Sequence, residues 1–140
     1  MSMGAGATTA IPAHLASFLA FDFGLKRTGV AVGNRLTGAA TPQATIKAQG
    51  DARWPLIEAR IAEWQPDALV IGVPWHPDGA AHDNTRRAQR FARQLRARFG
   101  LPVYEVDERY STTEALSAGA RDADAAAAAI ILEQFLRSLP

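Results

Sequence analysis

The chain has 140 residues, of which 48% are hydrophobic and 21% are charged, and its formal net charge is +1. This length fits one domain with its own core, and the composition argues against wholesale disorder. The absence of cysteine excludes disulfide frameworks, thiol nucleophiles and thiolate zinc sites. No apolar stretch reaches the roughly 18 to 20 residues of a membrane span. We therefore expect a soluble, intracellular protein with a flexible leader at 1–16 and a single domain at 17–140.

The first half of this domain predicts three strands, a helix and a further strand. The strands are 17–22, 28–34 and 40–48, with Gly24 and Gly29 suited to the turn between the first two. Residues 51–64 form an amphipathic helix that Asp51 can cap. Residues 68–73 are an uninterrupted apolar run, as in a central strand buried on both faces. The apolar face of the helix consists of Trp54, Ile57, Ile61 and Trp64.

The second half continues the alternation of helix and strand. Asp83 or Asn84 caps a helix that runs to Phe99, and a strand at 102–106 follows it. Ser111 and Glu114 fit a capping box that opens a short helix. Asp122 or Asp124 begins the last helix, whose buried stripe is Ile130, Ile131, Phe135 and Leu136. This order predicts an α/β fold built on a five-stranded mixed sheet with helices on both faces.

Acidic residues stand at three points where an apolar element starts or stops. Asp22 closes the first strand, Asp107 and Glu108 follow the last strand, and Asp124 lies in the first turn of the final helix. Each alone has an ordinary explanation: a turn aspartate, an ion pair with Arg109, or an acid that complements a helix N-terminus. Together they point to one site, because the carboxyl ends of parallel strands converge on the ligand-binding edge of a sheet.

Carboxylates gathered in one place repel each other unless cations neutralise them. Oxygen-only ligands suit Mg²⁺ or Mn²⁺, and paired metal ions support phosphodiester hydrolysis. The expected ligands are Asp22, Glu108 and Asp124, with Asp107 as the alternative to Glu108. In this hypothesis a water activated by the metal attacks phosphorus in line.

Four segments in order resemble the YqgF/RuvX family. Residues 21–33 resemble its DxGxxRxGxA signature, and residues 69–74 with Asp78 and Gly79 resemble its GxP…DG strand and loop. Residues 106–115 resemble its DERxST..A motif, and the segment from Asp124 to Glu133 resembles its closing DxxAAxxIL helix. The match covers about 18–136. It departs from the family in the loop at 74–82 and in the short segment at 116–121, which lacks a lysine-rich insert.

The resemblance implies an RNase H-like fold and a cytoplasmic bacterial nuclease that matures the 5′ end of pre-16S ribosomal RNA. Members are also described as similar to Holliday junction resolvases. Carried over by motif, Asp22 would be the first metal ligand, Glu108 or Asp107 the second, and Asp124 the third.

Arginines supply the expected contacts to nucleic acid. Arg27 and Arg109 stand beside the acidic positions, where each could reach a phosphate or pair with a carboxylate. Residues 86–98 hold six arginines and no acid, although solvated helix faces normally mix charges of both signs. Arg86, Arg90 and Arg93 of this run lie opposite the apolar face and could follow a phosphate backbone.

The sequence leaves several alternatives open. They are a resolvase that acts on branched DNA, a nucleic-acid-binding module without catalysis, and a nucleotide binder similar to sugar kinases, for which the chain is too short. The roles of His76 and His82 and a monomeric or homodimeric state also stay open. No P-loop or Rossmann fingerprint is present, and Ser111 has no His–Asp partners nearby.

Overall fold

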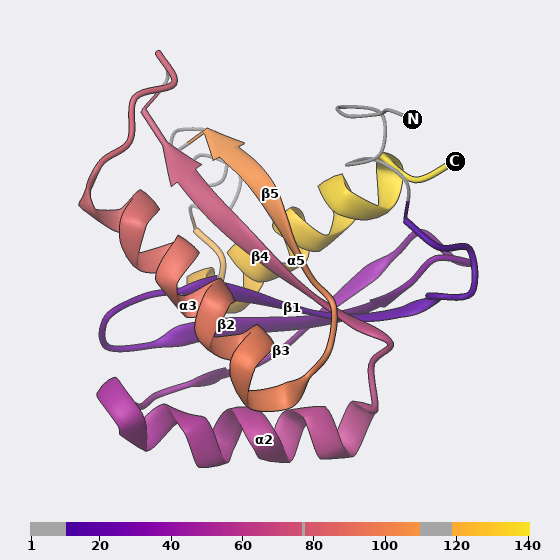
Figure 1. The fold of residues 1–140 in the computed structure, drawn as a ribbon, viewed down its shortest axis with the longest axis horizontal. Helices are drawn as coiled ribbons and strands as arrows, with labels where there is room; N and C mark the ends of the chain where they lie inside the picture. Colours follow the sequence, from indigo (N-terminus) through magenta and orange to yellow (C-terminus); the bar gives the residue numbers. More distant parts are fainter. Residues whose placement is uncertain (1–10, 77, 110–118) are drawn as a thin grey trace.

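A computed structural model describes residues 11–76, 78–109 and 119–140 of the chain. Five strands form one sheet in the order β3-β2-β1-β4-β5 (Figure 1). Pairing is antiparallel for β1–β2 and β2–β3 and parallel for β1–β4 and β4–β5, so the sheet is mixed, as predicted. The strands are β1 (Ser17–Phe23), β2 (Thr28–Asn34), β3 (Ala40–Ile46), β4 (Ala68–Trp75) and β5 (Val103–Arg109).

Helices cover both faces of this sheet, which also confirms the prediction. Helix α5 (Ala123–Arg137) lies across one face and contacts all five strands. Helices α2 (Arg53–Trp64) and α3 (Asp83–Phe99) lie on the opposite face, and a short 3-10 turn, η1 (Gly50–Ala52), precedes α2 (Figure 1). No helix in the described part of the chain is long and apolar enough to cross a membrane.

The local expectations differ from the structure at several places. His82, rather than Asp83 or Asn84, caps α3, because its ring accepts the N–H of Asn84. Neither η1 nor α2 has a side-chain cap, so Asp51 does not serve as one. Trp64, expected on the buried face of the helix, is 41% exposed at the end of α2.

Two further expectations concern chain segments. Strand β5 runs on to residue 109, so the acidic pair belongs to the strand instead of following it. Within the expected leader, Leu15 is buried and the Arg35 guanidinium donates to the carbonyl groups of Pro12 and Leu15. Residues 1–10 of that leader, and the capping box and short helix expected at 111–118, lie outside the described residues.

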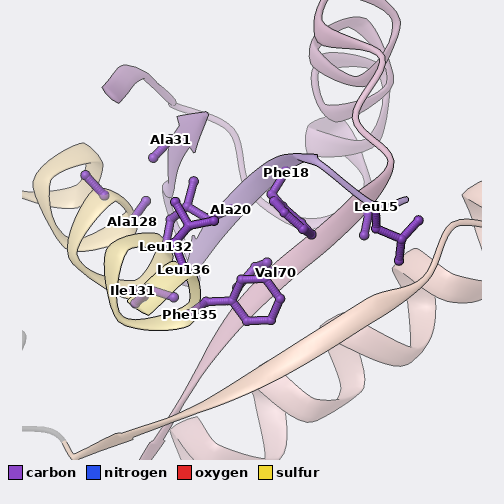
Figure 2. Packing of buried hydrophobic residues seen from close by; sticks show 12 residues of the cluster. Leu15, Phe18, Ala20, Ala31, Val70, Ala128, Ile131, Leu132, Phe135 and Leu136 are labelled. Atoms are coloured by element: carbon purple, nitrogen blue, oxygen red, sulfur yellow. The ribbon is translucent and has the colours of Figure 1, made fainter. Parts of the chain in front are cut away.

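Side chains of α5 and of the central strands form the core on one face of the sheet. Phe18 and Phe135 meet edge to face with ring centroids 5.1 Å apart, and Leu132 and Ile131 fill the space beside them (Figure 2). A second core of aromatic and aliphatic residues fills the opposite face between the sheet and the helices α2 and α3. Because each face carries its own core, the positions of the helices relative to the strands are fixed on both sides.

Glycines in the strands let α5 approach the sheet closely. A Cβ atom at Gly29 would overlap the main-chain carbonyl of Asp124, and a Cβ atom at Gly72 would overlap the Ile131 side chain. At Gly33 the added atom would lie 2.8 Å from Leu132 Cδ2. The contact at Gly29 involves backbone on both sides, so no rotation of a side chain could relieve an overlap there.

We expect Gly29→Ala to lower the free energy of unfolding by about 3 kcal/mol or more, because the added methyl group forces α5 away from β2. The matched control is Gly38→Ala. Gly38 has a φ of 67° and open space around it, so the same change there costs only about 1 kcal/mol of backbone strain. Urea unfolding measures both variants. A loss at Gly29 no larger than that at Gly38 would contradict the close approach.

Candidate active site

The alternation of side chains along the strands brings two of the predicted acids to the same face of the sheet. Successive side chains of a strand point to opposite faces. On β1, Phe18 and Ala20 contact the α5 core, so Asp22 has the orientation that faces α5. On β5, Tyr104 and Val106 pack against the same core, and Glu108 continues this series. Asp107 has the opposite parity, and its side chain is exposed.

The register of the sheet places these two acids near each other. Strand β4 lies between β1 and β5, with Phe21 opposite Ile71 and Gly72 opposite Val106. Extending the β1–β4 register by one residue places Asp22 opposite Gly72. Glu108 lies opposite Pro74, which is two residues further along β4. The space above Gly72 on this face of the sheet is occupied by the Ile131 side chain of α5.

The N-terminus of α5 brings Asp124 to the same place. Gly29 pairs with Asp22 in the β1–β2 ladder, and α5 touches the backbone of Gly29 through its Asp124 carbonyl. Asp122 caps the helix by accepting the Ala125 N–H at 3.2 Å. It also accepts the Thr45 hydroxyl at 2.6 Å, which ties the start of α5 to β3. Because Asp122 serves as the cap, the Asp124 side chain is left available to the site.

The environment of Asp22 disfavours its charged form. Desolvation by burial, together with the negative charge of Asp124, raises the pKa of the Asp22 carboxyl to about 7 from an ordinary value of 3.8. Near neutral pH a substantial part of the Asp22 population is therefore protonated unless a cation is present nearby.

Glu108 is in a similar environment. The side chain is 4% exposed, and within the described residues neither carboxylate oxygen has a hydrogen-bond partner. Burial first, and then the negative charges of Asp22 and Asp107, raise the Glu108 pKa to about 7 from 4.5. A buried, charged carboxylate whose two oxygens accept no hydrogen bond costs free energy. Binding of a proton or a cation to this side chain would remove that cost.

Arg27 places a positive charge beside Asp124. Its Nε lies 3.0 Å from Oδ2 of Asp124, and its side chain is 61% exposed at the end of the β1–β2 hairpin. Asp124 is thereby turned towards Arg27. In the ranges 11–76, 78–109 and 119–140, no three His, Asp or Glu side chains are drawn together closely enough to form a ready metal site.

The remaining predicted contact residues are spread over α3 and β5. Arg86, Arg90 and Arg93 are exposed on α3, and Arg86 also pairs with Asp83 at 3.6 Å. The backbone of Arg109 ends β5, but its side chain lies outside the described part of the structure.

His76 and His82 face each other across the loop that follows β4. Their ring centroids are 4.5 Å apart, and they line a shallow cavity of about 480 Å³ with Asp83, Asn84 and Arg87. The role of His82 in the described contacts is structural, since Nδ1 caps α3.

Sequence reasoning did not single out Arg53, which is the main polar residue on the opposite face of the hairpin. The residue is 3% exposed, and its guanidinium donates to the Leu25 carbonyl at 2.8 Å and to the Thr28 hydroxyl at 3.2 Å. It also lies 4.6 Å from the centre of the Phe23 ring. Arg53 thus supports the hairpin that carries Arg27, and its position in an amphipathic helix gives no local signal of this role.

Comparison with known proteins identifies the family. The family model described as "RuvX: Holliday junction resolvase" matches residues 16–138. The chain belongs to the RuvX family. A RuvX relative from Polaromonas sp. is 73% identical over 99% of this chain and 100% of its own length, and it is named "Putative pre-16S rRNA nuclease". A relative from Albidiferax ferrireducens with the same name is 71% identical over 92% of this chain and 83% of its own length.

Solved structures show what fold this RuvX chain has. Thermus thermophilus RuvC, solved in complex with a Holliday junction substrate, superposes with a TM-score of 0.50 at 16% identity. The match covers 87% of this chain and 94% of RuvC. Archaeoglobus fulgidus Pelota also gives a TM-score of 0.50 at 9% identity, over 87% of this chain but only 33% of Pelota. The RuvC likeness confirms the predicted RNase H-like fold.

The raised carboxyl pKa values predict how the stability of the metal-free protein depends on pH. Asp22 and Glu108 bind protons more tightly in the folded state, with pKa values of about 7, than in the unfolded chain, with 3.8 and 4.5. The folded state therefore loses relative stability as the pH rises from about 4 to about 7. In the presence of a chelator, we expect a lower Tm at pH 8 than at pH 5.5.

The Asp22→Asn variant tests the cause of this dependence. Removing the charge should raise the Tm at pH 8 by roughly 5 °C and flatten the difference between the two pH values. Asp51→Asn, which removes an exposed carboxylate near α2, should change neither. Differential scanning calorimetry makes the comparison, and an unchanged pH difference in Asp22→Asn would show that Asp22 is not the group responsible.

Proposed function

We propose that this protein is a divalent-metal-dependent nuclease that cleaves a phosphodiester bond in the 5′-end maturation of 16S ribosomal RNA. The observation that carries the proposal is the buried Glu108 carboxylate beside Asp22, which has no hydrogen-bond partner among the described residues and lies at the edge of an RNase H-like sheet. The names of the RuvX relatives at 73% and 71% identity support the substrate. A cytoplasmic location follows from this role.

The ligand chemistry of Asp22, Glu108 and Asp124 suits a hard divalent cation such as Mg²⁺ or Mn²⁺, although as placed the described residues do not bring three such side chains close enough for a ready site. These acids offer only oxygen ligands, and the orphaned oxygens of Glu108 and the raised pKa of Asp22 are the signs of a missing positive charge. Asp107 points to the other face of the sheet, so Glu108 is the better second ligand. A bound cation would neutralise the carboxylates and stabilise negative charge on the phosphodiester.

Arg27 has a distinct part in this proposal. Its ion pair with Asp124 compensates that carboxylate, whereas among the described residues no ion pair involves Asp22 or Glu108. If Asp124 held a cation, the exposed guanidinium of Arg27 would be available for a phosphate oxygen, which it could hold with two parallel hydrogen bonds. Arg109 would contact substrate from the end of β5. Arg86, Arg90 and Arg93 would contribute phosphate contacts along α3.

Cleavage of branched DNA is the second candidate function. It is favoured by the description of the matching family model as a Holliday junction resolvase. The arrangement of carboxylates suits hydrolysis of either nucleic acid. A resolvase would act as a homodimer on two strands, whereas a precursor RNA can be cleaved by a monomer.

Variants of the three carboxylates test the chemistry. We expect Asp22→Asn, Glu108→Gln and Asp124→Asn each to lower the rate of cleavage of a precursor 16S RNA at least ~100-fold, while the circular dichroism spectrum stays native-like and the Tm does not fall. Asp107→Asn is the matched control and should keep most of the activity, because it lies on the other face. Cleavage by Asp22→Asn at the parental rate would defeat the proposal.

Metal and substrate dependence provide a separate test. Cleavage of precursor RNA should stop in the presence of a chelator and return with Mg²⁺ or Mn²⁺. Calorimetric titration with Mg²⁺ should give a binding signal that Glu108→Gln abolishes, and no signal in the parent would favour a non-catalytic binding module. Faster cleavage of a four-way DNA junction than of precursor RNA would assign the protein to branched DNA instead.

A further inference from the structure

A groove lies on the face of the β1–β2 hairpin that points away from the carboxylates. It has a volume of about 540 Å³ and is bounded by the hairpin, by η1 with the start of α2, and by α3. Phe23 lines this groove and is the residue that directly follows Asp22 on β1. Because adjacent side chains of a strand point to opposite faces, only the thickness of one strand separates the groove from the carboxylate cluster.

The groove combines an apolar wall with a positively charged rim. Phe23, Leu25 and the buried rings of Trp54 and Phe91 supply the apolar surface, and Leu25 is 55% exposed. The basic groups that line it are Lys26, Arg53, Arg87 and Arg90, against a single acid, Asp51. A large exposed aliphatic side chain beside several cations is typical of a surface that takes a ligand with an apolar part and an anionic part.

The charges in the groove are poorly compensated by the protein. Among the ion pairs of the described residues, none involves Lys26, Arg53, Arg87 or Arg90. Arg53 is almost fully buried and is held by a hydroxyl, a carbonyl and the face of Phe23, all of which are uncharged groups. A buried cation without a counter-ion is costly, so an anion at the mouth of the groove would be stabilising.

The hairpin connects this groove with the cluster around Asp22. Lys26 and Arg27 are consecutive, yet Lys26 lines the groove whereas Arg27 pairs with Asp124 on the carboxylate side. A polyanion that crosses the end of the hairpin would therefore meet a positive charge on each side. This continuity suits a strand of nucleic acid better than a separate small ligand.

We propose that the groove binds an unpaired nucleotide of single-stranded RNA that flanks the phosphate to be cleaved. The proposal rests on the nuclease function proposed above and specifies its substrate as single-stranded at this point. The base packs against Phe23 and Leu25, and the neighbouring phosphates bind Lys26, Arg87 and Arg90. A base in a duplex is stacked and paired and could not enter the recess, whereas an unpaired base can be splayed into it.

Two double variants on the same helix separate groove contacts from general attraction. Arg87→Gln/Arg90→Gln removes two charges that line the groove, and Arg86→Gln/Arg93→Gln removes two exposed charges outside it. Fluorescence anisotropy in the presence of a chelator measures binding of a short oligouridylate and of an RNA duplex of equal length. The groove variant should lower affinity for the oligouridylate about tenfold and for the duplex much less. The control pair should lower both affinities equally.

A second pair of variants tests the contact with the base. Leu25→Ser should weaken binding of the oligouridylate severalfold and leave binding of an abasic strand unchanged. Leu36→Ser, at a leucine that is 89% exposed outside the groove, should change neither. These measurements need no metal and no cleavage. The groove proposal can therefore be contradicted while the nuclease assays support the proposed function, and the proposed function can be contradicted while the groove proposal is supported.

Several results would overturn the proposal. One is an equal loss of oligouridylate affinity in the groove variant and in its control. Another is a groove variant that loses as much affinity for the duplex as for the single strand. A third is a parent protein that binds the abasic strand as tightly as the oligouridylate. Binding of a polyglutamate peptide as tight as that of the oligouridylate would assign the groove to an acidic protein segment instead.

Discussion

The closeness of α5 to the sheet at Gly29 determines the geometry of the candidate site. Helix and strand touch there through main-chain atoms, so the distance between them is shorter than any side chain would permit. Gly29 is also the ladder partner of Asp22. This single contact therefore sets Asp124 beside Asp22, and the capping of α5 by Asp122 fixes the rotation of the helix by holding its first turn to Thr45.

The acids brought together by this contact and by the register of β5 are unfavourable for the folded state alone. Asp22 and Glu108 are held where burial and mutual repulsion oppose their charged forms, and Glu108 has no hydrogen-bond partner among the described residues. Apolar packing on both faces of the sheet compensates for this cost. Such stored instability is common where a protein must bind a charged group, because the ligand then supplies the missing interaction.

The β1–β2 hairpin divides two different chemical environments. On one side lie Asp22 and the ion pair between Arg27 and Asp124, and on the other lie Phe23, Lys26 and the buried guanidinium of Arg53. In our proposals the first environment acts on a phosphodiester and the second holds the adjacent unpaired nucleotide. Both depend on the same short hairpin, so its support by Arg53 matters for reaction and recognition alike.

The sequence by itself determined the α/β class, the limits of most strands and helices, and the acids worth considering, because hydrophobic periodicity and cap residues are local signals. It left Asp107 and Glu108 equivalent and offered both Asp122 and Asp124 as the helix cap. Only the tertiary structure separated these pairs, since strand parity relative to α5 and the contact with Thr45 involve residues far apart in the chain. The role of Arg53 could not be predicted from the sequence either. Its partners Leu25 and Thr28 become neighbours of Arg53 only when α2 packs against the sheet.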